Sequence, residues 1–397
     1  MAARSEARKN FVILARDAWG EVWRRRHFLA AELSKEHRVL FVEVPFPLMR
    51  GAAGAGGGRR SLRGVFSAAL RPAAVGGDLF VASPVKVFSD ALPGGRAVNL
   101  ALHARVIANA LRRLRMKDFI LWSNPEYGVD LIPLLRPALT VYDVTDDWTE
   151  APLPARERKR IAADDARMLR AADLVFTVSH DLFEKKRLRN RNTFLVPNGA
   201  PVEWYRDDLR TPEDIRDLPR PVLGYAGTLH PQRIDVDLAA ALAERVGGNG
   251  SVVFVGPDLM ETAAWQRLKR RANVRVLGAR RHDRVPAYVS SFDVCLIPHL
   301  VNRFTGSLNP IKVYEYLAAG KPIVSTLIEG AEEFSRFIVT ARGERFIEEA
   351  VRAAAAGVGD AALRRAAAAE NSWRRRAESA LRIIERTLGT HGKRAAG

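Results

Sequence analysis

The sequence predicts an α/β protein made of two domains, each built on a parallel β-sheet with helices on both faces. The chain has 397 residues, which is more than one ordinary hydrophobic core accommodates. Short apolar runs alternate with longer stretches of helical composition along nearly the whole chain. The apolar runs are continuous rather than alternating with polar residues, which is typical of strands buried on both faces of a parallel sheet.

The first half contains one complete series of these elements. A charged segment without a strand pattern, which carries Pro212 and Pro219, ends the series and predicts a linker. We therefore expect a first domain over 1–205 and a linker over 206–220. Strands are predicted at 12–14, 39–44, 79–82, 119–122, 139–144, 174–178 and 194–196, and helices at 21–34, 99–115, 153–172 and 179–189.

The second half repeats the alternation and predicts a second domain over 221–360. Residues 361–390 read as one or two helices, for which a return to the first domain is one option, and 391–397 as a frayed tail. Strands are predicted at 222–225, 252–255, 274–277, 294–297, 323–325 and 337–339, and helices at 234–246, 261–271, 283–290, 310–319 and 344–356.

Composition and charge limit the classes of function and location. The formal net charge is +18, which favours an anionic partner such as a phosphorylated substrate, lipid headgroups or nucleic acid. An arginine-rich composition without functional meaning explains the same charge, and both explanations stay open. No 18-residue apolar run occurs, and the single Cys295 lies in a core-like run. We expect a cytoplasmic protein, with peripheral contact to the inner face of the membrane as one use of the charge.

The most informative segment is SLNPIKVYEYLAAGKPIVST, residues 307–326. Asn309 suits the N-cap of a helix, Pro310 its first turn and Gly320 its end. A helix N-terminus at the edge of a parallel sheet binds phosphate through free N–H groups and its positive dipole end. Lys312 in the first turn adds a positive charge, and Glu315 one turn further on can accept both hydroxyls of a ribose. An ordinary capped helix with a surface Lys–Glu pair fits the spacing equally well.

This segment closely resembles the donor-site helix of GT-B glycosyltransferases of the bacterial cell-surface, group 1-like type. Four further segments resemble the same family: LGYAGTL (223–229), FDVCLIP (292–298), ADLVFTVS (172–179) and LVPNGA (195–200). The resemblance spans roughly residues 11–388. It implies two Rossmann-like domains that face each other across a cleft. It also implies a nucleoside-diphosphate sugar as co-substrate, held by the C-terminal half, and no bound cofactor.

The resemblance also implies roles for single residues at the donor site. Lys312 would meet the diphosphate and Glu315 the ribose, while Gly227 and Thr228 would lie under the diphosphate or the transferred sugar. Many retaining members carry a glutamate eight positions before the one at Glu315, where this chain has Ser307. The stereochemical outcome therefore stays open.

Three other residues are candidates for the donor side. Asn309 belongs to the same motif. His230 follows the Gly227 turn, where it either lines the cleft or is an ordinary histidine. Arg303 precedes the donor helix, where an arginine can neutralise a leaving diphosphate or simply be exposed.

A second cluster, YDVTDDW at 142–148, brings three aspartates to the end of a predicted strand. Clustered carboxylates raise one another's pKa, which suits a general base near neutral pH. The segment resembles that of inverting transferases that act on polyprenyl-linked exopolysaccharide intermediates. We expect Asp146 to be the base, followed by Asp147 and then Asp143. Aspartates that cap the next helix, or that bind a metal ion, are the alternatives. No His/Cys cluster with metal-ligand spacing occurs, so we expect no metal.

Arg16, Asp17 and Gly20 follow the first predicted strand and are candidates for the acceptor side. The sequence thus predicts transfer of a sugar to a hydroxyl of a glycan or polyprenyl-linked acceptor. A sugar-nucleotide epimerase or a non-catalytic sugar-nucleotide binder of the same fold remains an alternative. A basic nucleic-acid-binding protein is supported by charge alone, so we expect no nucleic-acid partner.

Overall fold

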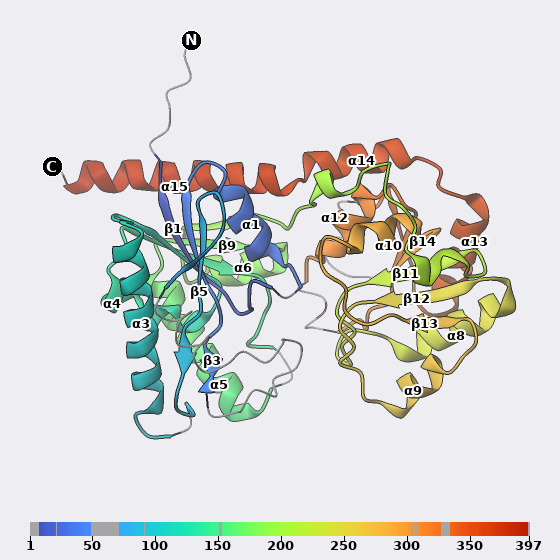
Figure 1. The fold of residues 1–397 in the computed structure, drawn as a ribbon, viewed down its shortest axis with the longest axis horizontal. Coiled ribbons are helices and arrows are strands. Elements are labelled where there is room, and N and C mark those ends of the chain that lie inside the picture. Colours follow the sequence, from blue (N-terminus) through green and yellow to red (C-terminus); the bar gives the residue numbers. More distant parts are fainter. Residues whose placement is uncertain are drawn as a thin grey trace, which may run out of the picture. The chain divides into compact units, whose positions relative to one another are not determined.

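The computed structural model describes residues 8–20, 22–48, 71–90, 92–150, 153–302, 305, 308–326 and 334–395. The chain folds into two compact units (Figure 1). Unit 1 comprises Met1–Thr177, Asp181–Val196 and Ala377–Gly397, and unit 2 comprises Val178–His180 and Pro197–Arg376. The prediction of an α/β protein with parallel sheets is confirmed in each unit.

Unit 1 is built on an eight-stranded sheet in the order β10-β9-β8-β7-β1-β2-β5-β4. All neighbours pair in parallel except β4, which runs antiparallel to β5. From β5 to β8 this is the doubly wound order, whose switch point lies between β1 and β7. The main strands are β1 (Asn10–Leu14), β2 (Arg38–Val42), β4 (Ala73–Gly76), β5 (Leu79–Ala82), β7 (Ile120–Ser123), β8 (Leu139–Val144), β9 (Leu174–Thr177) and β10 (Thr193–Leu195), and β3 (Phe46–Pro47) pairs with β6 (Val85–Lys86).

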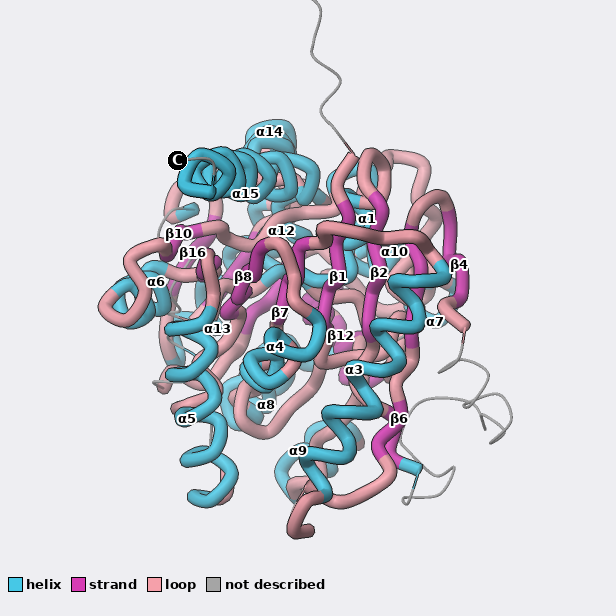
Figure 2. The backbone as a smooth tube through the Cα atoms, turned by 90° about the vertical axis from the view of Figure 1, so that its left-hand side faces the viewer, coloured by secondary structure: helices cyan, strands magenta, loops and turns pink. Residues whose placement is uncertain are grey.

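Helices cover both faces of the unit 1 sheet. On one face α3 (Gly95–Arg113) packs Ile107 and Leu111 against β1 and β2, and Figure 2 shows it running across the front of the strands. On the other face α1 (Arg25–Leu33) contacts β2, with His27 against Phe41. The unit is completed by η2 (Glu126–Asp130), α4 (Ile132–Leu135), α5 (Ala155–Ala171), α6 (His180–Arg187) and the later part of α15 (Trp373–Ala395).

Unit 2 has six parallel strands in the order β13-β12-β11-β14-β15-β16. Numbered along the unit this is 3-2-1-4-5-6, the order of dinucleotide-binding Rossmann folds, with its switch point between β11 and β14. The strands are β11 (Val222–Ala226), β12 (Ser251–Val255), β13 (Val274–Val276), β14 (Val294–Ile297), β15 (Ile323–Ser325) and β16 (Ile338–Thr340).

The continuous apolar strands of unit 2 are explained by two cores, one on each face of the sheet. In β11, Val222 joins the core beneath α10 and α12, whereas Leu223 joins the core beneath α8, α9 and α13. Figure 1 shows these helices on opposite sides of the sheet. The helices are α7 (Glu213–Arg216), α8 (Val236–Val246), α9 (Ala263–Lys269), α10 (Val285–Ser291), α12 (Ile311–Ala318), α13 (Gly343–Ala356) and α14 (Ala361–Glu370), together with the 3-10 turns η3 (Val202–Trp204) and η4 (Gly247–Asn249).

Several boundaries differ from those that the sequence predicts. The first helix begins at Arg25 rather than at residue 21, because tertiary contacts hold the preceding residues as a loop. The Trp19 N–H, for example, donates to Glu43 Oε1 at 2.8 Å. The last helix continues to Ala395, into the segment 391–397 that was expected to be a frayed tail. Gly320 ends α12 as predicted. It has φ +69° and a Schellman pair of bonds, Gly320 N–H to Leu317 O and Lys321 N–H to Tyr316 O.

The centre of the unit 2 sheet predicts a steric requirement for glycine at Gly224. A Cβ at this position of β11 would lie 2.2–2.3 Å from three ring atoms of the buried Phe292. We expect Gly224→Ala to lower the free energy of unfolding by about 1–3 kcal/mol through overpacking. Urea denaturation of the full chain measures this. Gly248→Ala, where a Cβ meets nothing within 4 Å, is the control. Equal midpoints for the two variants would contradict the packing argument.

Candidate functional site

The candidate site of unit 2 lies at the carboxyl end of β11, where two glycine turns cross. Gly227 has φ +151° and Gly256, after β12, has φ +144°. A Cβ on Gly256 would lie 2.0 Å from the Gly227 carbonyl oxygen, so the two backbones meet at a distance that no side chain permits. The turn at Gly227 therefore presents bare backbone at the switch point of the sheet.

Lys312, in the first turn of α12, places its ammonium group over this turn. A Cβ built on Gly227 would lie 3.1 Å from Lys312 Cε and 3.3 Å from Nζ. The same Nζ lies 5.1 Å from the centre of the Tyr225 ring, within cation–π range. Burial, reinforced by the positive charge of Arg233, lowers the pKa of Lys312 from 10.5 to about 8. The site thus holds a partly desolvated cation next to a glycine turn that has no side chain to cover its backbone.

Glu315 lies one turn further along α12 and is also largely removed from water. Burial raises the pKa of Glu315 from 4.5 to about 7, and the nearby Lys312 partly opposes this shift. A carboxylate held near its titration point accepts hydrogen bonds from ligand hydroxyls at low desolvation cost.

Two buried tyrosines contact the backbone at this turn through their hydroxyl groups. The Tyr225 hydroxyl lies 3.2 Å from His299 Nε2 and 3.4 Å from the Thr228 carbonyl oxygen. The Tyr316 hydroxyl accepts the Ala226 N–H at 2.8 Å. Burial, followed by the charge of Lys312, lowers the pKa of His299 well below its usual range. This histidine is therefore neutral and adds no competing charge.

The remaining donor-side candidates have mixed placements. Asn309 does not cap α12, because its Oδ1 accepts the Asn198 N–H at 3.0 Å and Pro310 takes the N-cap position. His230 follows the turn, and its Nδ1 accepts the Gln232 N–H at 3.1 Å. Burial and the charge of Arg233 lower the pKa of His230. Arg303 and Ser307 lie outside the described residues.

Sequence reasoning missed Arg233 and His299. Arg233 interacts electrostatically with Lys312, His230 and His299, and its carbonyl oxygen accepts the Leu300 N–H at 2.8 Å. Its position six residues after Gly227 is a usable signal, since it keeps this cation close to the turn in the chain. Nothing in the sequence pairs His299 with Tyr225, which lies 74 positions earlier.

In unit 1 the three aspartates occupy different environments at the carboxyl end of β8. Asp143 is fully buried and accepts hydrogen bonds from Arg25 Nε at 2.9 Å, Trp122 Nε1 at 3.1 Å and Asn124 Nδ2 at 3.2 Å. The ion pair with Arg25 ties α1 to β8, and the hydrogen bond from Asn124 ties the loop after β7 to β8. These contacts leave little access to Asp143 for a substrate.

Asp147 is buried and paired, whereas Asp146 is partly exposed. Asp147 accepts from Thr149 Oγ1 at 2.5 Å and from Lys185 Nζ at 3.2 Å. Burial alone would raise the pKa of Asp147, but these two partners and Lys186 lower it below its usual value. Asp146 accepts from Thr145 Oγ1 at 3.0 Å. Its greater exposure makes it the aspartate best placed to meet a substrate hydroxyl.

The acceptor-side candidates follow β1, at the switch point of the unit 1 sheet. Arg16 forms an ion pair with Glu126 and stacks over the Trp148 ring, 5.2 Å from its centre. Asp17 is held by Arg26 and Arg24, which lower its pKa against the opposing effect of burial. Gly20 is exposed, and a Cβ there would meet nothing within 4 Å, so glycine is not sterically required at this position. It also does not open α1, which begins at Arg25.

Two features are absent from the described residues. No group of three or more His, Cys, Asp or Glu side chains is arranged to hold a metal ion in the described part of the chain. Nor does any helix among the described residues have the length and apolar character needed to cross a membrane.

The match to a known protein family identifies the kind of domain that contains the unit 2 site. Residues 220–356 match the model of the family described as glycosyl transferases group 1. Residues 220–356 correspond to a group 1 glycosyltransferase domain. The matched range contains the Gly227 turn, Lys312 and Glu315, so the unit 2 site lies inside it.

Similar proteins extend the likeness beyond the matched domain. The putative teichuronic acid biosynthesis glycosyltransferase TuaH of Bacillus subtilis (strain 168) is 27% identical over 210 residues. That alignment covers 49% of this chain and 52% of TuaH, so the chain spans about half the length of this curated relative.

Solved glycosyltransferase structures match nearly the whole chain. Sucrose-phosphate synthase of Thermosynechococcus elongatus gives a TM-score of 0.68 at 13% identity, covering 96% of this chain and 100% of that one. HepE of Anabaena, solved in complex with UDP and glucose, gives 0.66 at 16% identity, covering 95% and 99%. At these identities the likeness establishes the fold, which is the two-domain GT-B fold that the sequence resemblance implies.

The raised pKa of Glu315 predicts a pH-dependent gain in stability for Glu315→Gln. Because the pKa in the folded protein, about 7, exceeds the unfolded value of 4.5, the folded state holds its proton more tightly. The wild type therefore loses stability as pH rises from about 4.5 to 7. We expect Glu315→Gln to be roughly 2 kcal/mol more stable than wild type at pH 8, and nearly equal to it at pH 4.5.

Urea denaturation at both pH values measures this difference. Glu261→Gln, which alters an exposed glutamate of the same unit, is the matched control and should show no such pH dependence. An identical stability difference at pH 4.5 and pH 8 for Glu315→Gln would show that the carboxyl is not desolvated.

Proposed function

We propose that this protein transfers a glycosyl group from a nucleoside-diphosphate sugar to a hydroxyl of a glycan or lipid-linked acceptor in cell-surface polysaccharide synthesis. We further propose that it works at the cytoplasmic face of the membrane and needs no metal ion. The observation that carries the proposal is the position of Lys312 over the Gly227 turn, at the switch point of a Rossmann-ordered sheet. TuaH, whose name places it in teichuronic acid biosynthesis, supports the polysaccharide role.

On the donor side, the diphosphate would lie against the backbone of Gly227 and Thr228. Lys312 provides a direct positive charge, and Arg233 adds a second one close enough to perturb it. Glu315 would accept the ribose hydroxyls. UDP is the nucleotide to test first, because HepE was solved with UDP. As the glycosidic bond breaks, negative charge develops on the leaving diphosphate, and a desolvated lysine stabilises it more strongly than an exposed one.

On the acceptor side, Asp146 would take the proton of the attacking hydroxyl. The nucleophile forms a bond to the anomeric carbon as the bond to the diphosphate breaks, in a single displacement. Asp143 and Asp147 are each held by a cation and by hydrogen bonds, so they orient the loop after β8. Arg26 interacts electrostatically with Asp146, so a cation lies close to the proposed base.

Lys312→Ala should weaken UDP binding by about tenfold or more, the loss expected for one charge-assisted contact to a phosphate. In the wild type, UDP affinity should fall as pH rises above about 8, because Lys312 loses its proton there. Lys312→Arg should keep its charge and flatten this dependence. Isothermal titration calorimetry between pH 6.5 and 9.5 measures all three proteins. Lys269→Ala, which removes a lysine paired with Asp258 in the same unit, should bind UDP normally.

Asp146→Asn should lower turnover by about a hundredfold or more while leaving UDP affinity unchanged, because it removes the proton acceptor alone. The assay follows labelled sugar from a panel of nucleotide sugars into glycan and lipid-linked acceptors. Asp118→Asn is the control, since Asp118 is exposed and has φ +46°, a conformation that asparagine tolerates. Full turnover by Asp146→Asn would remove the base assignment, and absence of transfer by the wild type would overturn the proposed function.

A further inference from the structure

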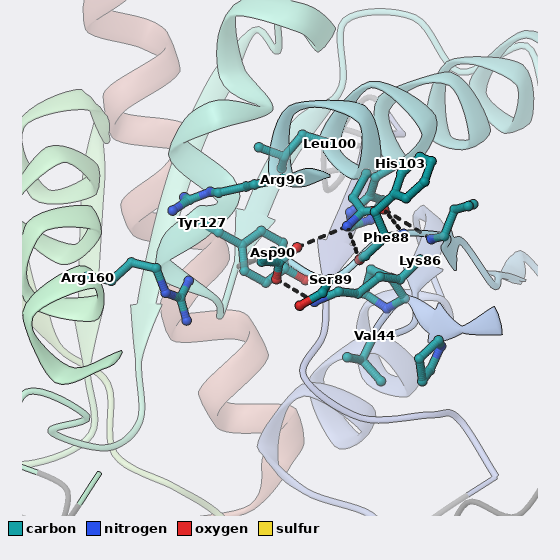
Figure 3. Close-up of a pocket in the computed structure, with 14 residues that line it drawn as sticks. Val44, Lys86, Phe88, Ser89, Asp90, Arg96, Leu100, His103, Tyr127 and Arg160 are labelled. Carbon is teal, nitrogen blue, oxygen red and sulfur yellow. Dashed lines mark hydrogen bonds and ion pairs between the residues drawn. The ribbon is translucent and has the colours of Figure 1, made fainter. Parts of the chain in front are cut away.

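Unit 1 contains a cavity of about 630 Å³ that the donor site and the aspartates do not account for. Its volume lies within the range of small-molecule binding sites. In Figure 3, the labelled residues Arg96, Leu100 and His103 approach it from α3 and Tyr127 from η2.

One side chain, Asn99 of α3, holds the wall of this cavity in place. Its Oδ1 accepts the N–H groups of Val87 and Phe88 at 3.0 and 3.2 Å. Its Nδ2 donates to the Phe88 carbonyl oxygen at 2.8 Å and to Asp90 Oδ1 at 3.0 Å. With its hydrogen-bonding capacity used in this way, Asn99 fixes the strip 87–90 against the helix and preforms the cavity.

Two buried polar atoms at the same cavity remain unused. His103 lies one turn after Asn99 on the same face of α3 and is 2% exposed, yet its Nε2 has no hydrogen-bond partner among the described residues. The buried Tyr127 hydroxyl has none either, and the two rings lie 6.1 Å apart. Unsatisfied buried polar atoms cost free energy, so two of them lining one preformed cavity point to a ligand that satisfies them.

The charges around the cavity already have partners. Lys86 pairs with Asp90, and Arg96 pairs with Asp130 and Asp164 at 2.6 and 2.7 Å. Burial lowers the pKa of His103 to about 4, so this side chain is neutral at physiological pH. The lining also contains Ser89 and Arg160, and Arg160 lies 3.9 Å from both Glu157 and Asp164. The remaining lining residues are apolar and include Leu100 and Phe88. A charged ligand group would gain little here, whereas a neutral ring with hydroxyls meets both the apolar wall and the two unused atoms.

We propose that this cavity binds an uncharged pyranose ring of the acceptor, with ring hydroxyls hydrogen-bonded to Tyr127 and His103. The C–H faces of the ring lie against Leu100 and Phe88, as apolar side chains pack against sugar rings. The role as acceptor rests on the proposed glycosyl transfer, but the binding of a neutral sugar ring does not. The cavity therefore selects neutral sugars over uronic acids.

Binding is tested with the full chain and two neutral probes, methyl β-D-glucopyranoside and methyl 2-acetamido-2-deoxy-β-D-glucopyranoside. Methyl β-D-glucopyranosiduronic acid is the charged counterpart. Saturation-transfer NMR titrations in the presence of saturating UDP keep the donor nucleotide site occupied. At least one neutral probe should bind about tenfold more tightly than the uronic acid. Failure of both neutral probes to bind, or equal binding of the uronic acid, would overturn the proposal.

Tyr127→Phe should weaken the neutral probe about fivefold, the effect of one lost hydrogen bond. It should not lower the melting temperature, because the hydroxyl it removes has no partner in the free protein. Tyr205→Phe is the matched control, since it removes another buried hydroxyl without a partner among the described residues, in unit 2. Ser89→Trp, at an exposed position of the cavity lining, should block binding through bulk. Unchanged affinity in both Tyr127→Phe and Ser89→Trp would place the sugar elsewhere.

Failure of the cavity assignment can be distinguished from failure of the proposed glycosyl transfer. If the wild type transfers sugar and Tyr127→Phe leaves the acceptor KM unchanged, the cavity assignment fails while the enzyme activity stands. If the wild type binds the neutral probe through Tyr127 but no nucleotide sugar is turned over, the cavity assignment stands as a sugar site and the transfer activity fails.

Discussion

The crossing of two backbone turns at Gly227 and Gly256 is the constraint on which the unit 2 site depends. Both residues have a positive φ, and a side chain on Gly256 would collide with the Gly227 carbonyl group. The crossing brings the ends of β11 and β12 together and leaves the backbone of the first turn uncovered. Lys312 of α12 reaches the space that a side chain on Gly227 would fill. The carboxyl end of β11 therefore carries a positive charge at this turn.

The placement of Lys312 and Glu315 has an energetic cost that their pKa shifts reveal. Burial works against the charge on both side chains, lowering the pKa of the lysine and raising that of the glutamate. Their mutual attraction offsets only part of this effect. A ligand that carries negative charge to Lys312 and hydroxyl groups to Glu315 would supply the missing interactions. Opposed shifts of this kind beside a glycine turn are typical of functional sites.

Much of the fold, but less of the site, follows from the sequence. The strand at Ile323–Ser325 and the glycine that ends α12 were predictable because buried strands and helix ends leave local signals. The antiparallel β4 was not, because it is a short exposed edge strand without an apolar pattern. The pairing of Asp143 with Arg25 joins residues 118 positions apart. No local pattern encodes such a contact, so the sequence could not separate a buried structural aspartate from a candidate base.

Buried charge is arranged differently in the two units, and this contrast explains why the cavity in unit 1 is informative. In unit 1 the buried charges around the aspartate loop are matched, as the pairs Asp17–Arg26 and Asp147–Lys185 show. Other buried polar atoms of unit 1, such as His37 Nε2 and Asn124 Oδ1, also have no hydrogen-bond partner among the described residues, but those of His103 and Tyr127 belong to residues that line the same cavity. Both are neutral groups beside charges that are already paired. The proposed selection of a ligand there consequently rests on shape and neutral hydrogen bonds, whereas the selection proposed for the Gly227 turn in unit 2 rests on charge.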